Sequence, residues 1–317
     1  MSEDQAISKI VALAGGVGGA KLAAGLERVL SSALTVIVNT GDDFEHLGLN
    51  ISPDVDTVCY TLAGLSNPDT GWGRAGETWS ALETISELGG PNWFRLGDRD
   101  IGLHLERTRR LREGQSLSKI TKDFCQALNI TSLVLPMSDE RLSTWVDTND
   151  GELPFQEYFV HQNCRPLVKG FRFVGAQSAT PAPGVLAALT EADLVVICPS
   201  NPWVSIAPIL AIPGIVEALE PKSVIAVSPI IGGQAVKGPA AKMYSELGFE
   251  PSALAVANHY KDFLTGFVLD QIDVKQEKDI QKMGIQTLAT DTLMPSEEDR
   301  VRLAKEVIKF GERLIGI

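Results

Sequence analysis

The first part of the chain constrains the fold most, because it has the pattern of a strand, a glycine-rich turn, a helix and a second strand. Ile10–Ala14 is a short apolar run that ends in glycine, as buried parallel strands often do. The glycine-rich segment 15–21 follows, and apolar residues then recur at helical spacing through 22–30. The next apolar run is Leu34–Val38. Together these segments predict a βαβ unit with parallel strands and a right-handed crossover.

The rest of the chain continues this alternation. Two strong buried strands are expected at 194–198 and at Ser223–Val227, and Ser296 is expected to cap a final helix. Weaker strand patterns occur at 133–135, 155–160 (as a hairpin), 172–174, 254–257 and 266–270. Because strands and helices alternate, the predicted fold is α/β, with a Rossmann-like, doubly wound and mostly parallel sheet.

Residues 71–129 differ from their surroundings, since they show helical patterns and no strand-like run. We interpret them as a small helical insertion domain, which leaves 1–70 and 130–317 as the Rossmann-like domain. The alternative is that these helices are ordinary crossovers of the sheet.

Charge and cysteine content narrow the functional class. The chain has 28 basic and 40 acidic residues, for a net charge of −12, whereas proteins that bind nucleic acids are usually basic. The four cysteines are scattered without CxxC spacing, which argues against structural zinc and for a reducing compartment. The polar segment 1–5 does not resemble a signal peptide, and no apolar run is long enough to span a membrane. We therefore expect a cytoplasmic protein with no nucleic-acid or membrane partner.

In open α/β sheets, ligands bind at the carboxyl ends of the strands, so the loops there are the candidate site. The glycine segment can present backbone N–H groups to a phosphate at a helix start, with Gly16, Gly18, Gly19 and Lys21 as candidates. The spacing is not that of a P-loop and only approximates the dinucleotide fingerprint. A tight strand-to-helix turn without a ligand remains the alternative.

Four carboxylates follow the second predicted strand: Asp42, Asp43, Asp54 and Asp56. Carboxylates gathered at one sheet edge can hold Mg²⁺, which prefers oxygen ligands and bridges phosphates. One of them could also accept a proton from an attacking alcohol. The alternative is that these aspartates serve only turns and the first turn of a helix.

Two later loops also follow buried strands. Ser200 and Asn201 come after the strand at 194–198, and Ser228 comes after Ser223–Val227. Lys242 lies one turn into a predicted helix. These groups could bind ribose, base or phosphate, or they could serve only as loop and cap residues.

Several motifs occur in a fixed order along nearly the whole chain. They are GGVGGAK at 15–21, NTGDD at 39–43, NISPDVDT at 50–57, LGDRD at 96–100, LPMSD at 135–139, PSNP at 199–202, SPIIG at 228–232 and DTLM at 291–294. In combination they resemble the 2-phospho-L-lactate transferase (CofD) family.

This resemblance implies a transferase of coenzyme F-420 biosynthesis. Such an enzyme joins the deazaflavin alcohol Fo to a phosphate-linked three-carbon acid, taken from a guanosine diphosphate donor with release of GMP. The resemblance also implies Mg²⁺ dependence and a homodimer. It places Fo contacts at Asp54 and Arg95. Combined with the physical chemistry of phosphoryl transfer, it leads us to expect that Asp42 or Asp54 holds Mg²⁺ and orients the alcohol.

Two other functions fit the sequence less well. A related family of nucleotide-sugar-binding regulatory proteins shares the opening glycine loop, but there a Gly-Gly-Ser-Ser run typically follows the acidic pair, and here Phe44 follows Asp43. An NAD-dependent oxidoreductase would carry an acidic residue at the end of the second strand, where this chain has Asn39. Whether the donor carries phospholactate, phosphoenolpyruvate or phosphoglycerate stays open.

Overall fold

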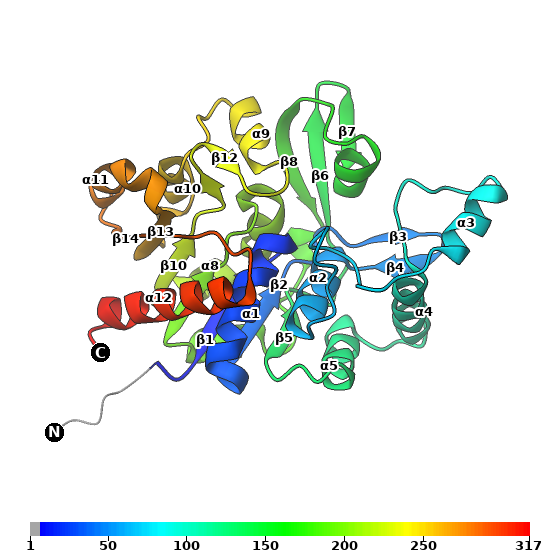
Figure 1. Ribbon diagram of the computed structural model, residues 1–317, viewed down its shortest axis with the longest axis horizontal. Coiled ribbons are helices and arrows are strands. Elements are labelled where there is room, and N and C mark those ends of the chain that lie inside the picture. The colour runs from blue at the N-terminus through cyan, green and yellow to red at the C-terminus, as the bar shows by residue number, and fades with distance from the viewer. Residues whose placement is uncertain (1–6) are drawn as a thin grey trace.

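A seven-stranded parallel sheet forms the centre of the protein, as the computed structural model of residues 7–317 shows (Figure 1). Residues 1–6 lie outside the described residues, and these include the segment 1–5 on which the expectation of no signal peptide rests. The strands, in their spatial order, are β14 (Gln286–Thr290), β13 (Gly266–Asp270), β10 (Ser223–Val227), β9 (Leu194–Ile197), β1 (Ile10–Ala14), β2 (Leu34–Val38) and β5 (Leu133–Pro136). All six strand pairings are parallel, which confirms the predicted class.

Strand β1 lies in the middle of this sheet, between β2 and β9, and all five of its residues are buried. Its side chains alternate between the two hydrophobic cores, one on each face of the sheet. Both faces need apolar residues, so the strand reads as a continuous apolar run rather than as an alternating pattern.

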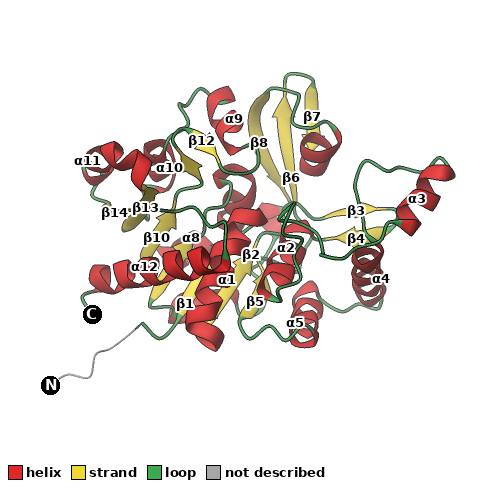
Figure 2. Ribbon diagram, in the orientation of Figure 1, coloured by secondary structure: helices red, strands yellow, loops and turns green. Residues whose placement is uncertain are grey.

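Helices cover both faces of the sheet (Figure 2). One face carries α1 (Gly16–Leu30), α2 (Pro53–Leu62), α5 (Leu117–Ala127) and α12 (Glu297–Ile315). The other carries α6 (Val185–Glu191), α7 (Ala207–Leu210), α8 (Ile215–Leu219), α10 (Ala253–Tyr260) and α11 (Glu277–Gln281). Within residues 7–317, no helix combines the length and apolar character needed to cross a bilayer.

The last helix packs directly on the first (Figure 1). Helix α12 begins as predicted at Ser296, whose hydroxyl and backbone N–H form a capping box with Asp299. Gly25 of α1 faces the backbone of Arg300, where a Cβ atom would overlap the carbonyl group. The missing side chain therefore lets the two helices approach closely.

An arm projects from this sheet domain, at the right of Figure 1. It contains the antiparallel pair β3 (Phe44–His46) and β4 (Leu49–Ile51), with α3 (Ser80–Glu87) and α4 (Asp98–Arg112). Helix α4 packs on β4, whereas α5 packs on β5 of the main sheet. The projecting part thus contains the strand pair at 44–51 as well as α3 and α4, whereas α5 covers the main sheet, and the division into two domains stays a prediction.

A second sheet, β7–β6–β8, lies above the main one in Figure 1 and consists of Gly151–Pro154, Ser143–Thr148 and Val168–Val174. The hairpin predicted at 155–160 is wrong, because the hairpin is β6–β7 and Glu157–His161 is helical. The strand predicted at 254–257 is also wrong, since these residues belong to α10. The remaining elements are β11 (Ile230–Ile231), β12 (Gln234–Ala235) and α9 (Ala240–Glu246).

Candidate active site

The chain reverses its direction of winding between β1 and β9. From β1 the sheet continues through β2 to β5, whereas β9, the neighbour of β1 on its other side, leads to β10, β13 and β14. Loops leave such a switch point in opposite directions, which opens a crevice at the carboxyl ends of the strands. The loops that meet here are the one after β1, which leads into α1, and the one after β9, which contains Pro199 and Ser200.

Most of the glycine-rich segment belongs to the first turn of α1 rather than to a loop. The helix begins at Gly16, whose φ of +62° is a left-handed conformation that glycine adopts without strain. A Cβ atom on Gly18 would overlap the carbonyl oxygen of Pro199, and one on Gly19 would overlap the Ser200 hydroxyl. These glycines therefore let the loop after β9 lie against α1.

Asp54, in the first turn of α2, lies at the start of α1. Its Oδ1 accepts a hydrogen bond of 2.7 Å from the Gly16 N–H, and its Oδ2 accepts one of 2.9 Å from Asn39 Nδ2. Burial raises the pKa of Asp54 to about 6, while these two hydrogen bonds favour the charged form and oppose the rise. Asp54 is thus a buried carboxylate that can gain or lose a proton near neutral pH.

Asp42 and Asp43 lie close to Asp54 and have unsatisfied oxygens. Each has a buried Oδ1 without a hydrogen-bond partner among residues 7–317, and the Oδ2 of Asp43 accepts a 2.6 Å bond from the Ser52 hydroxyl. Burial, followed by the charge of Asp54, raises the pKa of Asp42 well above its ordinary value. Burial likewise raises the pKa of Asp43.

This arrangement fits a magnesium ion. A divalent cation would supply the charge and the oxygen-binding partner that the buried carboxylates lack. Among residues 7–317, no group of three or more His, Cys, Asp or Glu side chains is placed so that it could hold a metal ion. The protein could therefore contribute one or two carboxylates, and water or substrate oxygens would complete the shell, as is common for Mg²⁺.

Asp56, the fourth carboxylate of the predicted set, does not join the other three. Its Oδ2 accepts a 3.1 Å bond from Arg107 Nη1, its Oδ1 contacts Arg107 Nη2, and His104 Nδ1 lies 3.7 Å away. Arg107 is only 1% exposed. Its positive charge lowers the pKa of Asp43, but burial raises that pKa by more. Arg107 was not predicted to belong here, because it lies on α4, 51 positions from Asp56.

Lys21 lies on α1 one turn beyond the glycines, and its Nζ donates a 3.0 Å bond to the Met294 carbonyl. Burial, then the positive charges of Arg300 and Lys237, lowers its pKa. Neither neighbouring cation was identified from the sequence. Val17 and Gly18 lie in the first turn of α1, where N–H groups have no partner inside an α-helix.

Of the other four residues predicted to bind the nucleotide, only Ser200 contacts the start of α1. Ser200 is at the site, where its Oγ accepts a 3.1 Å bond from the Gly15 N–H. Asn201 caps the turn that follows by accepting a bond from the Trp203 N–H, and Ser228 bonds with Ile230 inside its own turn. Lys242 is directed elsewhere: it bonds with Tyr158, Pro166 and Glu246.

Arg95 lies on the arm and is exposed, with its guanidinium carbon 4.4 Å from the centre of the Trp79 ring. The preceding residues, Trp93 and Phe94, contact Phe44 of β3, with ring centres 6.2 and 4.8 Å away. Trp93 also stacks on His161, at 5.1 Å. This aromatic group was not predicted, although two adjacent aromatic residues directly before Arg95 were a visible signal.

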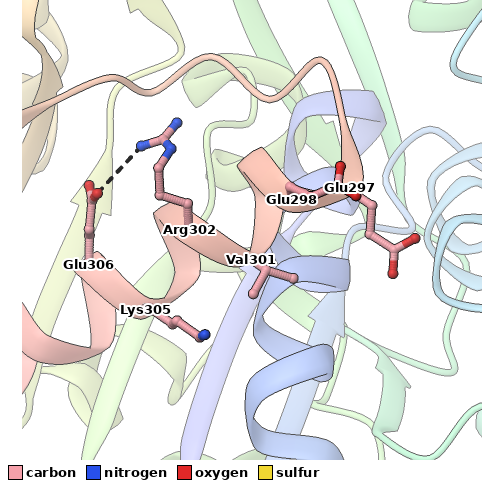
Figure 3. Close-up of a pocket in the computed structure, with 6 residues that line it drawn as sticks. All are labelled: Glu297, Glu298, Val301, Arg302, Lys305 and Glu306. Carbon is pink, nitrogen blue, oxygen red and sulfur yellow. Dashed lines mark ion pairs between the residues drawn. The ribbon is translucent and has the colours of Figure 1, made fainter.

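A depression of about 590 Å³ lies along the outer surface of α12 (Figure 3). Its lining comes from that single helix, and the side chains in Figure 3 are mostly charged and spread apart, with Arg302 directed toward Glu306. It contains none of the converging polar groups found at the carboxyl ends of β1 and β9, so we do not assign the site there.

Comparison with known proteins identifies the family of this chain. The model of the family described as 2-phospho-L-lactate transferase CofD matches residues 10–312. A protein of Kitasatospora aureofaciens named phosphoenolpyruvate transferase is 43% identical over 316 residues, which cover 96% of this chain and 98% of that protein. A 2-phospho-L-lactate transferase of Methanopyrus kandleri is 42% identical over 310 residues, covering 97% and 99%.

A solved structure of a upf0052-family protein from Bacillus halodurans has the same fold, with a TM-score of 0.66 and 16% identity, over 95% of this chain and 99% of that one. The sequence matches are much closer and span nearly the whole chain. The protein therefore belongs to the 2-phospho-L-lactate transferase CofD family and is a transferase.

Proposed function

We propose that this protein transfers a phosphate-linked three-carbon acid from a guanosine diphosphate donor to the terminal ribityl hydroxyl of Fo, in the biosynthesis of coenzyme F-420. The hydroxyl attacks the phosphorus on the acid side, and GMP leaves. The observation that carries the proposal is the hydrogen bond from the Gly16 N–H to the buried carboxylate of Asp54. It places a group that can accept a proton next to the N-terminus of a helix, where phosphates commonly bind.

Asp54 is the group that we expect to orient the attacking hydroxyl and accept its proton. A base is most effective when its pKa lies near the working pH, and a pKa of about 6 meets that condition. Asn39 and the Gly16 N–H hold both carboxylate oxygens in a fixed direction. Arg95 on the arm is the proposed second Fo contact.

The cofactor in this proposal is Mg²⁺, which Asp42 would hold, so that the neighbouring carboxylate of Asp54 stays free to accept the proton. When bound, it neutralises charge on the phosphate oxygens of the donor. The surrounding residues limit the access of bulk water to the carboxylates, because Asp42 and Asp54 are each only 6% exposed. Ser200, with Gly18 and Gly19 in the first turn of α1, brings the loop after β9 close to the phosphates. We further expect a cytoplasmic homodimer.

The test is turnover of Fo with each of three guanylylated acids, carrying phospholactate, phosphoenolpyruvate or phosphoglycerate, followed by mass spectrometry of the product. Asp54→Ala should lower kcat/KM by about 100-fold or more, on the scale of removing one group that stabilises a transition state. Circular dichroism should show an intact fold. Near-normal turnover by this variant would contradict the role of Asp54, and lack of turnover by the unaltered protein with all three donors would contradict the function.

A further inference from the structure

We propose that Asn39 is a positioning residue of the transfer reaction, whose side-chain amide holds Asp54, the turn that carries Asp42 and the segment after β9 in one fixed arrangement. This inference rests on the proposed function, in which Asp54 accepts the proton. In the sequence, Asn39 stands where an NAD-dependent enzyme would carry an acidic residue. The structure gives the amide at this position a role of its own.

Asn39 directly follows β2, at the carboxyl end of the main sheet. Its backbone N–H donates a 3.1 Å hydrogen bond to the Ala14 carbonyl, so it continues the pairing of β2 with β1. Its side chain is completely buried. A side chain fixed at the end of a central strand can hold its partners more precisely than one on a free loop.

The side-chain amide uses both of its N–H groups. Asn39 Nδ2 donates a 2.9 Å bond to Asp54 Oδ2 and a 3.2 Å bond to the Val204 carbonyl. Val204 belongs to the helical turn Pro202–Ile206, which follows β9. Among residues 7–317, Asn39 is the only side chain that donates a hydrogen bond to Asp54, and the other donor is the Gly16 N–H. The direction of Oδ2 therefore depends on Asn39.

The amide oxygen holds a third segment. Asn39 Oδ1 accepts a 2.8 Å bond from the Gly41 N–H. A Cβ atom on Gly41 would lie 3.0 Å from this oxygen and 2.7 Å from Thr144 Oγ1, so the turn can lie this close only because residue 41 has no side chain. Gly41 immediately precedes Asp42. The same side chain thus fixes the turn that carries the proposed magnesium ligand.

This set of partners is specific for an amide. One end of the Asn39 side chain faces a donor, the Gly41 N–H, and the other end faces two acceptors, Asp54 Oδ2 and the Val204 carbonyl. Asparagine has an acceptor at one end and two donors at the other, so it fits in one orientation. A carboxylate of the same shape could still accept from Gly41, but it has no N–H for Asp54 or Val204.

Without the amide, Asp54 would keep only the hydrogen bond from Gly16, and its carboxylate could turn about that contact. A catalytic group displaced by about 1 Å can lose on the order of 100-fold in rate. Because Asn39 acts through Asp54, its replacement should affect the chemical step more than the binding of either substrate.

The experiment is a double-mutant cycle, measured as turnover of Fo with the guanylylated acid that supports the reaction. Asn39→Asp and Asn39→Ala should each lower kcat by about 10- to 100-fold and leave both KM values within about threefold. In an Asp54→Ala background, Asn39→Asp should change kcat by less than about threefold, because the group through which it acts is absent. Mass spectrometry of the product can follow the slow variants.

Asn149→Asp is the matched control, because Asn149 is exposed in the turn between β6 and β7. Its Oδ1 accepts a bond from the Leu167 N–H, which aspartate can also accept, so kcat should be unchanged. An equal loss of kcat from Asn39→Asp with and without Asp54 would overturn the inference, as would unchanged turnover in Asn39→Asp. If circular dichroism shows that neither Asn39 variant folds, Asn39 serves the fold and the inference is wrong.

A measurement without substrates separates this inference from the proposed function. In ¹⁵N-labelled protein, the side-chain N–H resonances of Asn39 are identified by their loss in Asn39→Asp. They should shift in Asp54→Ala, and no shift would contradict the contact. If the unaltered protein turns over none of the three donors, the proposed function fails, while the shift still shows whether Asn39 holds Asp54.

Discussion

Asp42, like Asp43, has a buried Oδ1 without a hydrogen-bond partner among the described residues. Its pKa is raised in the folded protein, so the folded state binds a proton more tightly than the unfolded chain does. Its contribution to stability is therefore present below the ordinary carboxyl pKa of about 4 and is lost as the pH rises toward the folded-state pKa.

This gives a prediction for Asp42→Asn in metal-free protein. The amide cannot ionise, so the variant should gain stability relative to the unaltered protein as the pH is raised from 5 to 8. Urea denaturation in the presence of EDTA at several pH values measures the difference. If the free energy of unfolding changed with pH in the same way in both proteins, Asp42 would not be held in an unfavourable charged state.

The glycines of α1 allow a second test at the residue scale. Gly18→Ala should destabilise the protein by about 1–3 kcal/mol, because the methyl group would overlap the Pro199 carbonyl and force the loop after β9 away from the helix. Gly102→Ala on α4 is the control: a Cβ atom there meets nothing within 4 Å, so better helix propensity should stabilise by up to about 1 kcal/mol. Thermal unfolding compares the two variants. Equal effects on stability would contradict the close approach of the Pro199 carbonyl to Gly18.

At the scale of elements, the buried pair Asp56–Arg107 joins α2, which carries Asp54, to α4 of the arm. Arg107→Ala would leave Asp56 buried without its main partner and should cost about 3–5 kcal/mol. Arg109→Ala, at an exposed position with two acidic partners, should cost about 1 kcal/mol or less. Urea denaturation measures both, and a small loss for Arg107→Ala would mean that the arm is attached by other contacts.

The sequence predicted elements best where the hydrophobic pattern was unambiguous. β1, β2 and β10 have the expected bounds, because buried parallel strands are short apolar runs between turn residues. The run Leu254–Ala257 is equally apolar, yet Ser252 caps a helix there by accepting a bond from the Ala255 N–H. Ser252 was the residue that could have indicated a helix here, because a short apolar run alone is compatible with either a strand or a buried helix.

The site was predictable only in part. The rule that strand ends meet brought Asp42, Asp54 and Ser200 together correctly with the start of α1. The partners of Asp56 and Lys21 were not predictable, since Arg107 and the Met294 carbonyl reach them only through tertiary packing. Lys242 could have been set aside, because Glu246 lies four residues later and offers a local ion pair.

At the scale of the whole molecule, ligands that bind only the folded state should stabilise it. Mg²⁺ at 100 times its dissociation constant should add about 2.7 kcal/mol and raise Tm at pH 7. The increase should be smaller for Asp42→Asn, which removes a proposed ligand. Differential scanning calorimetry with MgCl₂, and with KCl at matched ionic strength, separates specific binding from screening. Equal shifts with both salts, or in both proteins, would contradict a magnesium site that includes Asp42.

The packing of α12 on α1 bears on how the polypeptide acquires its structure as it leaves the ribosome. The N-terminal βαβ unit is made first, and α2 can cover part of α1 soon afterwards, but the surface of α1 on which α12 packs has no cover until residues 297–315 have been synthesised. Contacts between such distant segments form slowly, and exposed apolar surface invites aggregation in the interval. Nascent chains that stall before α12 should therefore depend on chaperones and be degraded rapidly.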